Sequence, residues 1–155
     1  MGFKSCINHR AFTLLELIVV IIIIGILATV GLSQYNIVIE KGRAGESRPN
    51  LASMRKLVYE YYLKNGSLAS IVDNDVGVSA NGLPNACTSN YFFKYYTYDP
   101  TATYVQVVAR RCTSGAGGKN PPADREYAIT WTIRPGTGAD TFSSNYTSDW
   151  SVAPY

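Results

Sequence analysis

The chain has 155 residues, of which 46% are hydrophobic, 16% charged and 12% aromatic, with a net charge of +3. This length indicates one domain, alone or with an appended segment. The near balance of charge argues against a nucleic-acid-binding protein, which would carry a clustered basic patch and a higher isoelectric point than 8.7. Charge is unevenly spread, because Glu16 is the only charged residue between positions 12 and 39. We therefore expect a membrane segment joined to a polar, tyrosine-rich soluble head.

A short basic stretch precedes the apolar region. Lys4 and Arg10 are its charges, and positions 12–32 then supply 21 residues, close to the ~20 that span a bilayer as a helix. Positive charge before the span predicts that the N-terminus stays in the cytoplasm and that the rest is translocated. A secretory signal peptide has a shorter apolar core, followed by its small-residue cleavage site. Here the small residue Ala11 precedes the apolar run, so the order is reversed.

The residues at this boundary resemble those of a known family. The string AFTLLEL at positions 11–17, followed by IVVIIIIGILATVGLSQY, is similar to the N-terminus of type IV pilins and of type II secretion pseudopilins. The resemblance implies that a membrane peptidase cuts between Ala11 and Phe12 on the cytoplasmic side and methylates the new Phe12 amine. It also implies a role in assembly for Glu16, which is the fifth residue counted from Phe12 and the hallmark acid of the family.

Two positions depart from the family pattern. Ala11 stands where glycine usually precedes the cleavage site, and Ser33 stands where many pilins have a proline that loosens the helix inside filaments. The alternative interpretation is a plain signal-anchor helix with Glu16 near the membrane surface. A carboxylate deep in a bilayer costs roughly 3 kcal/mol or more, so a lone acid in such a run is uncommon. This cost favours the pilin-like interpretation.

Removal of the leader, residues 1–11, would also remove the single histidine, His9. Histidine is the commonest general base and metal ligand near neutral pH. A chain without histidine cannot form a Ser–His or Cys–His nucleophilic pair. We therefore expect a protein that is not an enzyme and that takes no cofactor.

The helical pattern continues beyond the apolar span. Apolar and aromatic residues recur at three- and four-residue spacings, at Leu51, Met54, Leu57, Val58, Tyr61 and Tyr62. Asn65-Gly66 is a typical helix stop. We expect one long helix over residues 12–64, of which residues 12–32 form the membrane-spanning or filament-core part. Pro49 lies inside this run and predicts a bend near residues 45–49.

Residues 65–155 predict a small head. Glycine, proline and serine indicate a loop over residues 65–90. Aromatic and β-branched residues predict strands near residues 91–98, 104–112 and 127–133. We expect an α+β fold in which a three-stranded antiparallel sheet packs on the C-terminal half of the helix, as in type IV pilins. The tail from Gly136 either adds a short pairing or lies as a polar flap.

The cysteines indicate a crosslink in the head. Cys6 would leave with the leader, so that Cys87 and Cys112 remain. An even pair in a translocated segment predicts a disulfide, because disulfides persist outside the cytoplasm. Closing a loop of about 26 residues would stabilise the head by roughly 3–4 kcal/mol. The alternative is that both cysteines are unpaired small hydrophobic residues.

Other short patterns carry weaker signals. The SGAGGK segment at residues 114–119 lacks the spacing and the following helix of a phosphate-binding loop. Asp73-Asn-Asp-Val-Gly77 resembles half of a calcium loop but lacks the distal glutamate, so we expect no metal site. Asn65 and Asn145 each begin a glycosylation sequon, a pattern with a high chance rate.

The resemblance implies three candidate functions. The first is a type IV pilin, a structural subunit that polymerises through its hydrophobic helix into an extracellular filament for adhesion or motility. The second is a pseudopilin of a type II secretion system, whose short filament stays in the periplasm. The third is a minor pilin that acts as a membrane-anchored binding module in adhesion or DNA uptake. Without Lys4 and Arg10 the chain has 12 basic and 11 acidic residues, which offers little cationic surface for DNA.

The resemblance also implies partners and a location. Identical subunits, the prepilin peptidase and the assembly machinery of the inner membrane are the expected partners, and no nucleic acid is predicted. The precursor would cross the inner membrane once, with its N-terminus in the cytoplasm. The cysteine pair and the Ser/Thr/Asn-rich head favour exposure outside the cell, and hence the pilin over the pseudopilin.

Overall fold

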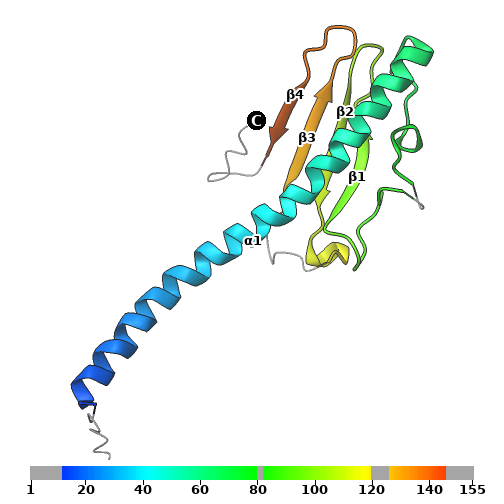
Figure 1. Ribbon diagram of the computed structural model, residues 1–155. Coiled ribbons are helices and arrows are strands. Elements are labelled where there is room, and N and C mark those ends of the chain that lie inside the picture. The colour runs from blue at the N-terminus through cyan, green and yellow to red at the C-terminus, as the bar shows by residue number, and fades with distance from the viewer. Residues whose placement is uncertain (1–11, 80–81, 120–125, 146–155) are drawn as a thin grey trace, which may run out of the picture. The chain divides into compact units, whose positions relative to one another are not determined.

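The computed structural model describes residues 12–79, 82–119 and 126–145. The chain divides into two units, Met1–Gly42 and Arg43–Tyr155. One helix, α1 (Leu14–Asn65), contributes to both units (Figure 1). Pro49 lies inside α1, which continues through it.

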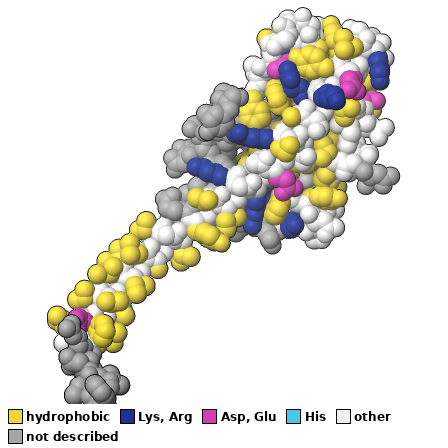
Figure 2. Space-filling model, in the orientation of Figure 1, with side chains coloured by type: hydrophobic (Ala, Val, Ile, Leu, Met, Phe, Trp, Pro, Cys, Tyr) yellow, Lys and Arg dark blue, Asp and Glu magenta, His cyan; other side chains and the backbone are white. Residues whose placement is uncertain are grey.

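The N-terminal unit is an apolar stretch of helix. Leu14–Leu32 is long and apolar enough to cross a membrane, and none of it is buried within the protein. Its side chains are widely exposed, for example Leu14 at 76% and Leu27 at 66% (Figure 2). Contiguous apolar surface of this extent marks a membrane or protein contact site. Exposure of this stretch to water is unfavourable, so we expect lipid or other protein to cover it.

The second unit, the head, begins with the C-terminal half of α1. Its buried residues recur at three- and four-residue spacings, which places them on one side of an α-helix: Ala44, Ser47, Leu51, Met54 and Val58. Leu57, Tyr61 and Tyr62, which belong to the same expected face, are only partly buried. Gly66 follows the helix with a φ of 70°, a left-handed conformation that is typical of a helix stop.

The sheet of the head has four antiparallel strands in the order β1-β2-β3-β4. Their bounds are Phe93–Tyr98, Val105–Arg111, Ala128–Ile133 and Thr141–Ser144. The first three lie inside the segments expected from the sequence. The fourth lies in the tail from Gly136, for which the sequence left open a short pairing or a polar flap, because TFSS is short and carries one apolar residue, Phe142. It pairs with β3, with Phe142 opposite Trp131.

The strand register directs one face of the sheet toward α1. Tyr95 lies opposite Ala109, and Ala109 lies opposite Ile129, so the side chains of these three residues point to the same side. All three are buried. Asn50 Nδ2 of α1 donates a hydrogen bond to Tyr95 Oη at 2.8 Å, and Figure 1 shows α1 crossing this face. The α+β fold class predicted from the sequence is confirmed.

The segment between α1 and β1 covers the outer edge of β1. It contains a short 3₁₀ helix, η1 (Asp73–Val76). The Tyr95 N–H donates to the Pro84 carbonyl at 2.8 Å, and the Thr97 N–H donates to Asp73 Oδ1 at 2.6 Å. Because an exposed edge strand pairs readily with other chains, these two bonds protect the sheet on this side.

Candidate processing and assembly site

Thr13 and Glu16 form a capping box at the start of α1. The Glu16 N–H donates to Thr13 Oγ1 at 3.2 Å, and the Thr13 N–H donates to Glu16 Oε2 at 3.2 Å. The Thr13 hydroxyl also donates to that carboxylate oxygen, at 3.0 Å. The first turn of a helix leaves backbone donors without partners, and this reciprocal arrangement satisfies two of them. Thr-x-x-Glu is the sequence signature of a capping box. The family motif, by contrast, predicts a role for Glu16 only and none for Thr13.

The carboxylate of Glu16 stands in apolar surroundings. Its neighbours Leu15 and Leu17 are 74% and 60% exposed. Among the residues that the structure describes, Glu16 accepts hydrogen bonds from Thr13 and forms no ion pair. Hydrogen bonds offset part of the cost of burying a carboxylate, but a positive partner offsets more. Glu16 is thus held in place with its charge available to a cation.

The structure places one of the two predicted processing residues, Phe12, at this same end of α1. Phe12 precedes the helix and is 79% exposed. It directly precedes Thr13, so an amine on Phe12 would stand next to the capping box. Ala11, on the other side of the expected cleavage bond, lies outside the described residues, as do Lys4, Cys6, His9 and Arg10.

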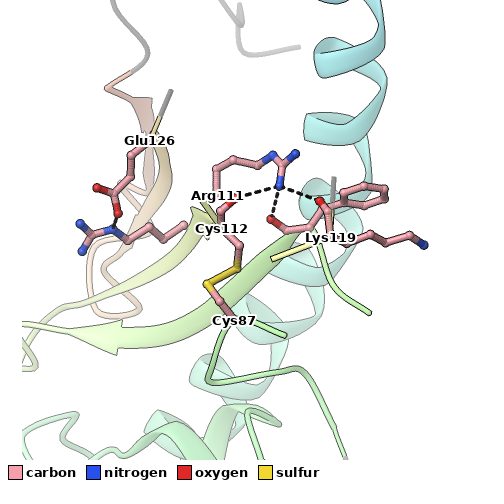
Figure 3. The surroundings of a disulfide bond; sticks show 7 residues. Cys87, Arg111, Cys112, Lys119 and Glu126 are labelled. Carbon is pink, nitrogen blue, oxygen red and sulfur yellow. Dashed lines mark hydrogen bonds and ion pairs between the residues drawn. A yellow bond between two sulfur atoms is a disulfide. The ribbon is translucent and has the colours of Figure 1, made fainter. Parts of the chain in front are cut away.

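The other predicted pair lies in the head. Cys87 and Cys112 form a disulfide that joins the segment before β1 to the residue after β2 (Figure 3). Next to it, Arg111 is 1% exposed. Its Nη1 donates to the carbonyl oxygens of Phe92 at 2.9 Å, of Cys112 at 3.1 Å and of Lys119 at 3.4 Å. This buried guanidinium holds three backbone segments around the disulfide.

The SGAGGK segment packs on this disulfide. Ser114–Ala116 forms a short 3₁₀ helix, η2, and Gly117 follows with a φ of 71°. A Cβ atom on Gly118 would lie 2.2 Å from Cys112 Cβ, which no side chain tolerates. The glycines of this segment therefore allow a tight turn against Cys112. This role agrees with the absence of the phosphate-loop spacing from the segment.

A polar cluster that the sequence pattern does not reveal joins α1 to the loop before β4. Arg55 Nε lies 2.5 Å from Asp140 Oδ2, and Tyr59 Oη donates to the same oxygen at 3.1 Å. Asp140 Oδ1 accepts the Arg134 N–H at 2.8 Å. The hydrogen bond to Asp140 raises the pKa of Arg55, and burial together with Asp140 raises the pKa of Tyr59. Arg55 and Asp140 are 85 positions apart, so no local spacing could predict the contact.

The acidic residues of the calcium-like segment have other partners. Asp73 Oδ1 accepts from Thr97 N and Thr97 Oγ1, and Asp75 Oδ2 accepts from Val72 N. Within the described ranges, no group of three or more His, Cys, Asp or Glu side chains could hold a metal ion.

Both sequon asparagines make hydrogen bonds with the backbone. Asn65 Nδ2 donates to the Tyr61 carbonyl at 3.0 Å at the end of α1, and Asn65 is exposed. Asn145 Oδ1 accepts the Ala128 N–H at 2.6 Å at the end of β4. Residues 146–147 of the second sequon lie outside the described residues.

Comparison with known proteins supports the assignment of the N-terminal segment. No solved structure matches the chain. Residues 7–32 match the model of the prokaryotic N-terminal methylation motif. This range contains the Ala11–Phe12 boundary, the Thr13–Glu16 capping box and the apolar stretch to Leu32. The chain therefore carries the N-terminal signal of type IV pilins and pseudopilins, as the sequence predicts.

Proposed function

We propose that this protein is a type IV pilin, a structural subunit that polymerises through its hydrophobic N-terminal helix into an extracellular filament. The observation that carries the proposal is the methylation motif joined to the apolar stretch Leu14–Leu32, none of which is buried within the protein. In the precursor, the inner membrane covers this surface. In the filament, the same stretch of neighbouring copies covers it, so the apolar side chains never face water.

Processing would prepare the chain for this exchange. The prepilin peptidase cleaves between Ala11 and Phe12 and methylates the Phe12 amine on the cytoplasmic side of the inner membrane. The head is translocated, because the basic residues before the span keep the N-terminus in the cytoplasm. It then forms its Cys87–Cys112 disulfide outside the cytoplasm. The assembly machinery of the inner membrane then adds the subunit to the base of the growing fibre.

Glu16 would set the axial register of the subunits. Cleavage creates a positive amine on Phe12, and a single ammonium or carboxylate in a hydrocarbon environment costs several kcal/mol. Glu16 of an incoming subunit pairs with the Phe12 amine of a neighbour already in the fibre. The aliphatic side chains of Leu14–Leu32 supply attraction without direction, so this charge pair selects the register.

Two related functions share the motif. A pseudopilin would build a short filament confined to the periplasm, and a minor pilin would occur at low copy number as an adhesion or DNA-uptake module. The Ser/Thr/Asn-rich head favours a subunit exposed outside the cell, whereas the disulfide would form both there and in the periplasm.

Electron microscopy of sheared surface fibres, combined with mass spectrometry of their subunits, tests the proposal. We expect fibres whose main component is this chain, beginning at methylated Phe12. A chain found only in periplasmic filaments would identify a pseudopilin. A chain found only as a trace component of fibres built from another protein would identify a minor pilin.

A further inference from the structure

The segment that covers the outer edge of β1 has two parts, which differ in how they are held. In the first part, residues 66–79, four residues are at most 2% exposed and lie in the core: Leu68, Ile71, Val76 and Val78. In the second part, residues 82–92, no residue is buried. We call residues 82–92 the strap. Burial of apolar side chains therefore holds the first part in place but not the strap.

Each part protects one backbone donor of β1. The first part supplies the carboxylate of Asp73, whose Oδ1 accepts the Thr97 N–H at 2.6 Å. The strap supplies the carbonyl oxygen of Pro84, which accepts the Tyr95 N–H at 2.8 Å. Thr97 and Tyr95 belong to the same strand, so their N–H groups report separately on the two parts.

The strap is fastened at both ends and in the middle. Near its start, the Leu83 N–H donates to the Gly77 carbonyl at 2.9 Å, and at its end the Phe92 carbonyl accepts the Cys112 N–H at 2.9 Å. Among the described residues, positions 85–87 take part in no hydrogen bond. The disulfide to Cys112 is thus what ties this middle section to the sheet (Figure 3).

The two sulfurs of this bond differ in how easily a thiol reaches them. Cys112 is 0% exposed, whereas Cys87 is partly exposed. Thiol–disulfide exchange begins when a thiolate attacks an accessible sulfur. The first thiol of a dithiol therefore bonds to Cys87 Sγ and displaces Cys112 as a thiolate, which takes up a proton. The second thiol then displaces Cys87, so that the dithiol loses two electrons and two protons and becomes a disulfide, and both cysteines become thiols.

We propose that the Cys87–Cys112 disulfide is a redox-sensitive fastening of the β1 edge. On reduction, the strap moves off β1 and uncovers the Tyr95 N–H, whereas residues 66–79 stay in the core and keep the Thr97 N–H covered. An uncovered edge strand pairs readily with other chains. The edge is therefore fully closed only after the head has been oxidised outside the cytoplasm. This inference goes beyond the proposed function and does not depend on it, since the strap belongs to the head alone.

Limited proteolysis of the full chain in detergent tests the fastening. A broad-specificity protease should cut the strap about tenfold faster after treatment with dithiothreitol, because cleavage follows the population of the locally opened state. Residues 136–139 are exposed and are not joined to the disulfide, so their cleavage rate should stay the same. Cys87→Ser should show the fast cut without reductant and no change with it. Ser89→Ala, at an exposed position of the strap, keeps the disulfide and is the matched control, which should respond to dithiothreitol as the wild-type chain does.

Nuclear magnetic resonance of the same samples reports on the β1 edge itself. The temperature dependence of an amide proton shift distinguishes an N–H that is hydrogen-bonded in the folded state from one that is open to water. On reduction, the Tyr95 N–H should change from bonded to open, and the Thr97 N–H should stay bonded. A strap that is cut at the same rate with and without dithiothreitol would overturn the proposal, as would a Tyr95 N–H that stays bonded. Cleavage of residues 66–79 as fast as that of the strap, or loss of both N–H bonds, would overturn it too, because the head would then loosen as a whole.

Discussion

Glu16 has a local role at the start of α1 that suits the intermolecular role we propose for it. Its carboxylate accepts two hydrogen bonds from Thr13 and so fixes the start of α1. The same bonds hold its charge within one turn of the position at which cleavage would create the Phe12 amine. In the proposed filament, a capped helix start would thus orient the acid before a neighbouring subunit arrives.

Replacement of Glu16 separates these roles. Glu16→Ala should leave membrane insertion, cleavage and the head intact but abolish or sharply reduce filaments, because the register-setting charge is lost. The measurement is fibre mass after shearing, with the mature subunit counted in the membrane. Glu16→Asp should be partly defective, because the shorter acid reaches less far. Normal fibres from Glu16→Ala alone would show that the charge pair does not set the register.

Thr13→Val provides a test of the capping box. The change removes the hydroxyl bonds of the box but keeps the Glu16 charge, and loss of a helix cap costs about 1 kcal/mol. Fibre mass should therefore fall less than in Glu16→Ala. Equal losses in the two variants would mean that Glu16 acts mainly as a cap and not as a charge.

Tyr95 predicts how the head responds to alkali. Burial raises the pKa of Tyr95 above its ordinary value, since the phenolate would lie between α1 and the sheet. The folded state therefore holds this proton more tightly than the unfolded state, so stability is full below about pH 10 and falls as the pH rises beyond it. Thermal unfolding of the full chain in detergent should show this decline, and Tyr95→Phe should flatten it. A decline of the same slope in Tyr95→Phe would exclude Tyr95 as its source.

At the scale of elements, the turn on the disulfide is the most constrained segment of the head. Gly118→Ala should destabilise the head by about 1–3 kcal/mol, because the new methyl group would overlap Cys112 Cβ. Gly115→Ala, three residues earlier, is the matched control, since nothing lies within 4 Å of its Cβ position. Denaturant unfolding of both variants in detergent would compare them, and equal stability would show that the turn moves freely.

The disulfide supplies a second test on this scale. Cys87→Ser should lower the free energy of unfolding by roughly 3–4 kcal/mol, the chain-entropy value for a loop of this length. Reductant should destabilise the wild-type chain by a similar amount and leave the Cys87→Ser variant unchanged. A wild-type chain that is indifferent to reductant would mean that the crosslink contributes little to the head.

The elements differ in how well their own residues predict them. The head half of the helix and the first three strands carry periodic apolar patterns, because each of these segments buries side chains at regular spacings. The strand Thr141–Ser144 has no such pattern, because its pairing depends on β3 being in place. The Arg55–Asp140 contact and the burial of Arg111 likewise arise only when distant segments meet. The FTLLEL string lies within the methylation motif matched over residues 7–32, because that signal is local, and the roles of Phe12 and Glu16 stay predictions.

For the whole molecule, the first prediction is the mass of the mature subunit. Intact-mass measurement should show loss of residues 1–11 and one added methyl group on Phe12, as the methylation motif over residues 7–32 indicates. A strain lacking the peptidase is the control, and its subunit should retain the leader. A mature mass that includes His9 and Arg10 would contradict the processing scheme.

The protected edge of β1 has a consequence for how copies of this protein accumulate. The Pro84 carbonyl and the Asp73 carboxylate already occupy donors of that edge, so any strand pairing between heads is confined to the β4 side. Two heads joined through β4 would use up both available edges, and such pairing would stop at a pair. Crowded heads are thereby kept from stacking into an endless sheet of the amyloid kind. In the proposed filament, unlimited growth would be left to the apolar helices, whose association would follow cleavage of the leader.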